Sequence, residues 1–302
     1  MICSLCPRRC GARRERDYGE GYCGMGTEPV VARAALHHWE EPCISGSRGS
    51  GTVFFSGCTL GCVFCQNYEI SAKRFGKKIS VRRLADIFRE LESQGAHNIN
   101  LVNPTHFVPA IAEAFSLYRP GIPVVYNSSG YESRQTLSMM NGLVDIYLPD
   151  LKYIESGVSE KYSHAPDYFF HASQAVGEML RQTGSPVYDE NGMMTRGTLV
   201  RHLILHQNTK NSILVLRWLA EHYPHAPVSL MAQYLPMGRA QEYPEINRII
   251  TKREYEKVLA ALFDSGLDGF VQERASAKKD FVPSFLLEGV EENKKEGKEE
   301  VK

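Results

Sequence analysis

Short apolar segments alternate with amphipathic segments along the chain after about residue 50. The apolar segments have the length of buried strands and lie at 53–55, 99–102, 123–126, 144–148, 199–205, 228–232 and 269–271. Between them, apolar residues recur at helical spacing over 81–91, 109–117, 132–141, 159–181, 211–222 and 252–265. Repeated strand–helix–strand units predict a parallel sheet. We expect an α/β fold, a partial (β/α)6 TIM-like barrel, with an open doubly wound sheet as the alternative.

The two ends of the chain depart from this pattern. Residues 1–50 contain five of the eight cysteines and few periodic apolar residues, which predicts a Cys-rich N-terminal metal-binding extension. The barrel is expected over 51–285. Residues 286–302 are rich in charge, and we expect a disordered tail there. Turn-forming residues over 184–197 predict a loop.

Composition narrows the classes of partner. Thirty-five Lys and Arg residues balance 35 Asp and Glu residues, which argues against a nucleic acid or an anionic membrane as the main partner. No apolar run approaches the ~20 residues that a membrane span needs, and the first residues lack the apolar segment of a signal peptide. We therefore expect a cytoplasmic protein whose thiols are reduced, with cysteines that serve metal or redox chemistry.

Three cysteines lie on one short loop directly after the first barrel strand. Their spacing is Cys58-x3-Cys62-x2-Cys65. Three thiolates can bind three irons of a 4Fe–4S cluster and leave the fourth iron open to a small molecule. The chemistry of parallel barrels lies on loops at the carboxyl ends of the strands, where this loop is expected. A zinc site or chance clustering is the alternative.

A second set of cysteines lies in the extension. Cys3, Cys6 and Cys10 are followed by Cys23, and four thiolates close a tetrahedral zinc site or saturate a second iron–sulfur cluster. Ligand softness does not separate these two metals. Cys43 is expected to be a buried apolar thiol. The segment 37–41 is expected to be polar surface.

The loop at 58–65 resembles the cluster motif of radical S-adenosylmethionine (SAM) enzymes, including the aromatic Phe64 before the third cysteine. The ending Cys65-Gln66-Asn67 is most similar to the pyruvate formate-lyase activating enzyme branch, and in particular to uncharacterised homologues of that activase. The resemblance covers about residues 40–280. It implies an oxidoreductase in which a 4Fe–4S cluster binds the methionine part of SAM, an electron breaks a C–S bond, and the resulting radical abstracts hydrogen from a substrate.

The resemblance also assigns SAM contacts to polar residues at strand ends. Lys152 is expected to neutralise the SAM carboxylate, with Asp150 holding that lysine or a ribose. The family's Gly-Gly-Glu-like stretch, which receives the amino group of SAM, is replaced here by Asn103-Pro104-Thr105-His106. This departure leaves only neutral acceptors for that amino group. For Thr105 and Ser128, the alternative to SAM binding is that the side chain caps the local backbone. The cofactor-binding candidates are Asn103, Thr105, His106, Asn127, Ser128, Asp150, Lys152, Arg201 and Gln233.

By analogy with the activase, the expected substrate is a glycyl residue of a partner protein, and the expected electron donor is a flavodoxin or ferredoxin. A small molecule is an alternative substrate. RNA is another, although the balanced charge of the chain disfavours binding to phosphates. A third alternative is a non-catalytic zinc or iron–sulfur scaffold, which the missing Gly-Gly-Glu stretch would suit. No residue is assigned to the hydrogen transfer itself.

Overall fold

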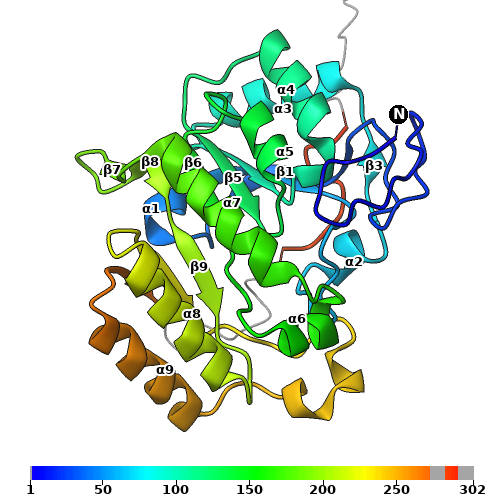
Figure 1. Cartoon of the computed structure of the whole chain (residues 1–302). Helices are drawn as coiled ribbons and strands as arrows, with labels where there is room; N and C mark the ends of the chain where they lie inside the picture. Colours follow the sequence, from blue (N-terminus) through cyan, green and yellow to red (C-terminus); the bar gives the residue numbers. More distant parts are fainter. Residues whose placement is uncertain (1, 273–282, 292–302) are drawn as a thin grey trace, which may run out of the picture.

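The computed structural model describes residues 2–272 and 283–291 (Figure 1). Its centre is a set of parallel strands that follow one another in space. They are β2 (Ser50–Phe55), β4 (Ile99–Val102), β5 (Val124–Ser128), β6 (Ile146–Pro149), β9 (Val200–Leu203), β10 (Val228–Met231) and β11 (Gly269–Val271). A single bridge between Asp150 and Arg201 joins β6 to β9. The parallel strands expected from the apolar segments are therefore present.

Helices follow the strands, as expected for βαβ units (Figure 1). They are α2 (Tyr68–Ser71), α3 (Val81–Ser93), α4 (Val108–Leu117), α5 (Arg134–Met139), α6 (Ser156–Ser163), α7 (Tyr168–Thr183), α8 (Thr209–His222) and α9 (Lys252–Ser265). The Ser80 side chain caps α3 by accepting a hydrogen bond from the Arg83 amide at 3.1 Å. The single helix expected over 159–181 is instead two helices, because His164 takes a left-handed conformation (φ 49°) that ends α6.

Helix α1 (Pro42–Ser45) lies against the amino-terminal ends of the parallel strands. Cys43 and Ile44 are 3% and 0% exposed and belong to one core cluster with Val125, Ile146 and Leu148. Burial raises the pKa of the Cys43 thiol to about 12. Cys43 is thus the buried apolar thiol that the sequence predicts.

The sequence pattern did not predict strand β1 (Val30–His37), which pairs antiparallel with β2. A bulge between Val31 and Arg33 shifts the register and interrupts the alternation of buried and exposed residues, so the period of two is lost. The short strand β3 (Lys77–Lys78) pairs with the other edge of β1. Residues 1–50 therefore contribute a strand to the main sheet.

The loop expected over 184–197 contains the strands β7 (Val187–Tyr188) and β8 (Met194–Thr198). β7 and β8 form a hairpin whose tip contains the turn residues, and Gly197 and Thr198 pair in parallel with β6. The expectation of a loop was wrong because turn-forming residues dominate the composition of the segment and conceal two short strands.

The first residues of the expected tail contact β1. The Leu287 amide donates to the Ala32 carbonyl at 3.1 Å, the Ala34 amide donates to the Glu288 carbonyl at 2.8 Å, and Val290 is 1% exposed. Residues 286–291 are therefore ordered against the sheet, and 292–302 lie outside the described residues. Within the described part of the chain, no helix has both the length and the apolar character needed to cross a membrane.

Candidate functional site

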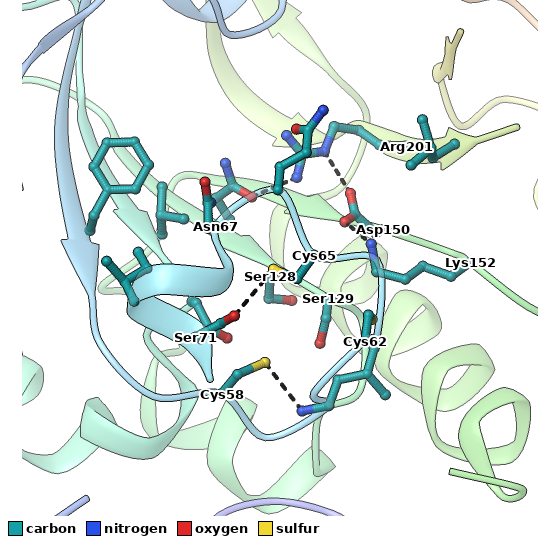
Figure 2. Close-up of a pocket in the computed structure, with 18 of the residues that line it drawn as sticks. Cys58, Cys62, Cys65, Asn67, Ser71, Ser128, Ser129, Asp150, Lys152 and Arg201 are labelled. Atoms are coloured by element: carbon teal, nitrogen blue, oxygen red, sulfur yellow. Dashed lines mark hydrogen bonds and ion pairs between the residues drawn. The ribbon is translucent and has the colours of Figure 1, made fainter. Parts of the chain in front are cut away.

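A pocket opens at the carboxyl ends of the parallel strands, where the loops of a barrel converge. The loop after β2 forms one wall, and the other walls include the ends of β4, β5, β6, β9 and β10 and the segment that follows β1. Figure 2 shows the side chains that point into the pocket. Its polar lining includes Glu40, Cys58, Cys62, Cys65, Gln66, Asn67, Asn103, Asn127, Ser128, Ser129, Asp150, Lys152, Arg201 and Gln233. The pocket thus brings together the three loop cysteines and most of the expected SAM-binding residues.

The three loop cysteines all contribute to this pocket (Figure 2). Each sulfur accepts at least one hydrogen bond from the chain. The donors, at 3.1–3.4 Å, are the amides of Leu60 and Gly61 for Cys58, the Ser163 hydroxyl for Cys62 and the Ser71 hydroxyl for Cys65. Such bonds suit thiolate sulfur, and hydrogen bonds to sulfur help to set the potential of iron–sulfur clusters.

The chemistry of this donor set fits a 4Fe–4S cluster with one open iron. Burial, followed by repulsion from the neighbouring thiols, raises the pKa of Cys65 to about 12 and also raises the pKa of Cys58. Three clustered, desolvated thiols lose their protons readily only when a bound cation compensates the charge. Among the described residues, no three Cys, His, Asp or Glu side chains are arranged to hold a single metal ion.

Asp150, Lys152 and Arg201 form a buried ion-pair network beside the cysteine loop (Figure 2). Asp150 lies 2.6 Å from Lys152 Nζ and 2.8 Å from Arg201 Nε. Burial by itself raises the pKa of Asp150, but the two cations outweigh burial and hold that pKa below its usual range. Burial likewise lowers the pKa of Lys152, and the charge of Asp150 more than reverses this. Both side chains are therefore charged at neutral pH.

Glu40 completes this network, although the sequence predicted polar surface over 37–41. Arg201 donates to the Glu40 carboxylate at 3.1 Å and to the Asn127 side chain at 2.6 Å, while Asn127 donates to Glu40 at 3.0 Å. Trp39 and His37 also line the pocket. The expectation of exposed surface holds for His38 and Trp39 but was wrong for His37, Glu40 and Glu41. Their burial depends on β1 pairing with β2, and no local sequence signal shows that pairing.

Two SAM-binding candidates lie outside the pocket lining. Thr105 is fully buried and donates to Glu132 at 2.7 Å. His106 Nε2 donates to the Ser56 carbonyl at 2.7 Å, and burial lowers the pKa of His106 to about 4. Asn103 lines the pocket but takes a left-handed conformation (φ 59°), after which the chain turns into the 3₁₀ helix Thr105–Phe107. This turn places both side chains in the core.

The segment 127–130 contributes hydroxyl groups with different surroundings. The Ser128 hydroxyl accepts a hydrogen bond from the Gly130 amide at 3.2 Å. The Ser129 hydroxyl lines the pocket and has no hydrogen-bond partner within the described residues. Glu132 follows this segment in the sequence, and burial raises the pKa of its carboxyl group to about 7. Neither Ser129 nor Glu132 was a candidate from sequence, because only the fold shows which polar groups lack a partner or lose their water.

The four cysteines of the extension lie apart from this pocket. Cys3 is buried, Cys6 and Cys23 are half-buried, and Cys10 is exposed. The Cys3 amide donates to the Ala12 carbonyl at 2.9 Å, and a Cβ atom on Gly21 would lie 3.0 Å from Cys10 Sγ. The stretches of chain that carry Cys3, Cys10 and Cys23 therefore lie side by side.

Comparison with known proteins agrees with this site. Residues 52–199 match the radical SAM superfamily. An uncharacterized protein of Methanocaldococcus jannaschii is 30% identical over 276 residues, which cover 88% of this chain and 75% of that protein. A radical SAM methyltransferase from Sphaerobacter thermophilus has a similar fold, with a TM-score of 0.51 and 13% identity over 74% of this chain and 66% of that one.

Streptococcus suis SuiB, solved with bound S-adenosylmethionine, aligns with a TM-score of 0.48 and 13% identity over 72% of this chain. The chain spans about half of SuiB, namely 48% of its length. The family match and the alternating order of strand and helix agree with the partial barrel predicted from the sequence. The chain belongs to the radical SAM superfamily.

Proposed function

We propose that this enzyme binds a 4Fe–4S cluster through Cys58, Cys62 and Cys65, cleaves SAM reductively, and abstracts a hydrogen atom from a glycyl residue of a partner protein. The strongest support is that three thiols line one pocket with every sulfur accepting a hydrogen bond. When bound, the cluster and SAM supply the electron transfer and the radical chemistry. The chain itself binds, orients and shields them.

The buried charges beside the cysteine loop suit a zwitterionic cofactor. Lys152 lines the same pocket as Cys58 and Cys62, the proposed cluster ligands (Figure 2). We assign the SAM carboxylate to Lys152, with Asp150 holding the lysine side chain in place. Each of the three guanidinium nitrogens of Arg201 already donates to Asp150, Glu40 or Asn127, and we therefore give Arg201 a positioning role.

The SAM amino group needs an acceptor, because the Glu of the family's Gly-Gly-Glu-like stretch is missing. Thr105 and His106 are buried elsewhere, whereas Asn103 and Ser129 line the pocket. The Ser129 hydroxyl has no other partner within the described residues. We assign the amino group to Asn103 and Ser129. A hydrogen bond to a charged group contributes about 1.5–3 kcal/mol, so Ser129→Ala should weaken SAM binding by at least about tenfold in equilibrium dialysis.

The substrate class rests on the resemblance to the activase. The ending Cys65-Gln66-Asn67 and the motif Asp150-Leu151-Lys152 are similar to its motifs. Trp39 lines the pocket and is 59% exposed, which leaves aromatic surface for a polypeptide. We propose a flavodoxin or ferredoxin as electron donor. We also propose the reducing cytoplasm as compartment, because all eight cysteines are free thiols.

The cluster assignment is tested on protein reconstituted anaerobically with iron and sulfide, reduced with dithionite and mixed with SAM. We expect an electron paramagnetic resonance signal that shifts on SAM addition, together with 5′-deoxyadenosine release. Cys58→Ala, Cys62→Ala and Cys65→Ala should each abolish both results. Cys43→Ala is the matched control, since its thiol is buried outside the pocket. Loaded protein that never cleaves SAM would favour the scaffold alternative.

The substrate class has a separate test. The reconstituted enzyme is mixed with a lysate whose proteins carry glycine deuterated at Cα, and 5′-deoxyadenosine is analysed by mass spectrometry. Deuterium in the 5′-deoxyadenosine, absent with deuterated alanine, is expected. Cleavage of SAM without deuterium transfer from glycine would contradict the glycyl substrate and leave the cluster assignment standing.

A further inference from the structure

Arg8 connects the amino-terminal cysteines to the catalytic loop. It lies between Cys6 and Cys10 in the sequence. Its guanidinium group donates hydrogen bonds to four backbone carbonyls on two segments. The acceptors are Thr59 (3.0 Å), Leu60 (2.8 Å), Ser163 (2.8 Å) and His164. A planar guanidinium group suits such a set of acceptors, which a lysine cannot contact together.

Tyr22, the neighbour of Cys23, contacts the same loop. Its hydroxyl donates to the Leu60 carbonyl at 3.2 Å, and the Arg8 guanidinium lies 4.0 Å from the centre of its ring. Gly61 permits this approach, because a Cβ atom there would lie 2.5 Å from the Tyr22 hydroxyl. Arg8, which lies between two cysteines in the sequence, and Tyr22, which precedes a third, therefore both contact the short segment between Cys58 and Cys62.

The backbone that Arg8 holds is the backbone that serves the cluster thiols. The Leu60 carbonyl accepts from Arg8, and the Leu60 amide donates to Cys58 Sγ at 3.3 Å. The Ser163 carbonyl accepts from Arg8, and the Ser163 hydroxyl donates to Cys62 Sγ at 3.1 Å. Displacement of Arg8 would therefore disturb the hydrogen-bond donors of two of the three sulfurs.

The segment that carries the four cysteines, residues 2–26, contains little regular structure. Among the described residues, the strand-like pairing within this segment is limited to isolated bridges, Ile2 with Arg13 and Arg14 with Gly19. Small segments with little core need a metal or a covalent link to stay folded. Four thiols lie in this segment at the spacing x2, x3 and x12, on stretches of chain that lie side by side, and four thiolates saturate an iron–sulfur cluster.

We infer that Cys3, Cys6, Cys10 and Cys23 bind an iron–sulfur cluster as a tetrathiolate site, because no three of the described thiols are arranged around a single metal ion, and that this cluster holds Arg8 and Tyr22 against the Cys58–Cys65 loop. Metal loading of the extension then orders the loop that carries the catalytic cluster. The catalytic importance of that loop rests on the proposed function; the metal site and its contact with the loop do not.

Metal binding is measured on the full chain with Cys58, Cys62 and Cys65 replaced by serine, so that only the extension can load. The protein is incubated anaerobically either with Zn²⁺ alone or with iron and sulfide, then desalted. We expect about four irons per chain to remain bound. Cys10→Ser or Cys23→Ser should remove the iron, while Cys43→Ser retains it. Loss of the iron on desalting, or retention of zinc alone, would overturn the inference.

Ordering of the loop is measured by hydrogen exchange of peptides covering 57–66 in the same background. Metal loading should slow exchange by at least about tenfold. Arg8→Lys should retain the metal and lose this slowing, whereas the exposed Arg9→Lys is the control that keeps it. Bound metal without slower exchange, or Arg8→Lys behaving as the parent chain, would overturn the inference. Neither readout involves SAM, so failure of SAM cleavage alone would count against the proposed function only.

Discussion

Replacing Asp150 by asparagine removes the carboxylate that lies between two buried cations. The change preserves side-chain shape, but Lys152 and Arg201 lose the charge that lies 2.6 and 2.8 Å from their nitrogens. The three side chains are only 12–15% exposed, so water replaces the lost partner poorly. The pKa of Lys152 should also fall, because the charge of Asp150 is the main influence that raises it against burial.

The expected loss of stability is large. Breaking a buried ion pair by removing one partner costs about 3–5 kcal/mol, because an uncompensated charge remains. With a urea slope of about 3 kcal/mol per molar, the unfolding midpoint should fall by about 1–1.7 M. Glu69→Gln is the matched control, since it breaks an exposed pair with Lys73 whose side chains are 58% and 59% exposed. That change should cost at most about 0.5 kcal/mol.

The assay is equilibrium urea unfolding of the metal-free, reduced protein, followed by circular dichroism and intrinsic fluorescence. Both variants are compared with the parent chain at pH 7, where Asp150 and Lys152 are charged. Equal midpoints for the two variants, with unchanged slopes, would refute the reasoning, because burial would then have no effect on the energy of this network. Coincident transitions from the two probes establish that a single midpoint is meaningful.

Two further predictions concern the surroundings of the pocket. Burial raises the pKa of Glu132 from 4.5 to about 7, so its stabilising contribution is complete below pH 4.5 and is lost as the pH rises to 7. The difference in unfolding free energy between the parent chain and Glu132→Gln should therefore fall by about 3 kcal/mol over that range, and a constant difference would contradict the assignment. Gly130→Ala should destabilise the fold by at least about 2 kcal/mol more than Gly142→Ala in the same urea assay. Both glycines have φ near 75°, but a Cβ atom on Gly130 would lie 2.2 Å from the Asp150 carbonyl oxygen, whereas a Cβ atom on Gly142 would meet open space. Similar losses of stability in the two variants would show that backbone strain alone, and not this contact, determines the cost.

The sequence by itself determined the parallel barrel, the cysteine loop and many of the polar residues that line the pocket. Strand and helix periods are local properties, and the carboxyl ends of parallel strands must meet at one face. Residues as distant as Cys58, Asp150 and Gln233 could therefore be assigned to one site from their positions at strand ends.

Tertiary structure decided the contacts that depend on long-range pairing. Glu40 enters the pocket because the bulged strand β1 pairs with β2, and Arg8 contacts the cysteine loop although it lies about 50 residues away in the chain. Thr105 and His106 leave the pocket because Asn103 reverses the backbone after β4. Periodicity and motif spacing describe neighbours along the chain, whereas burial and the direction of a side chain depend on segments that meet only when the whole chain folds.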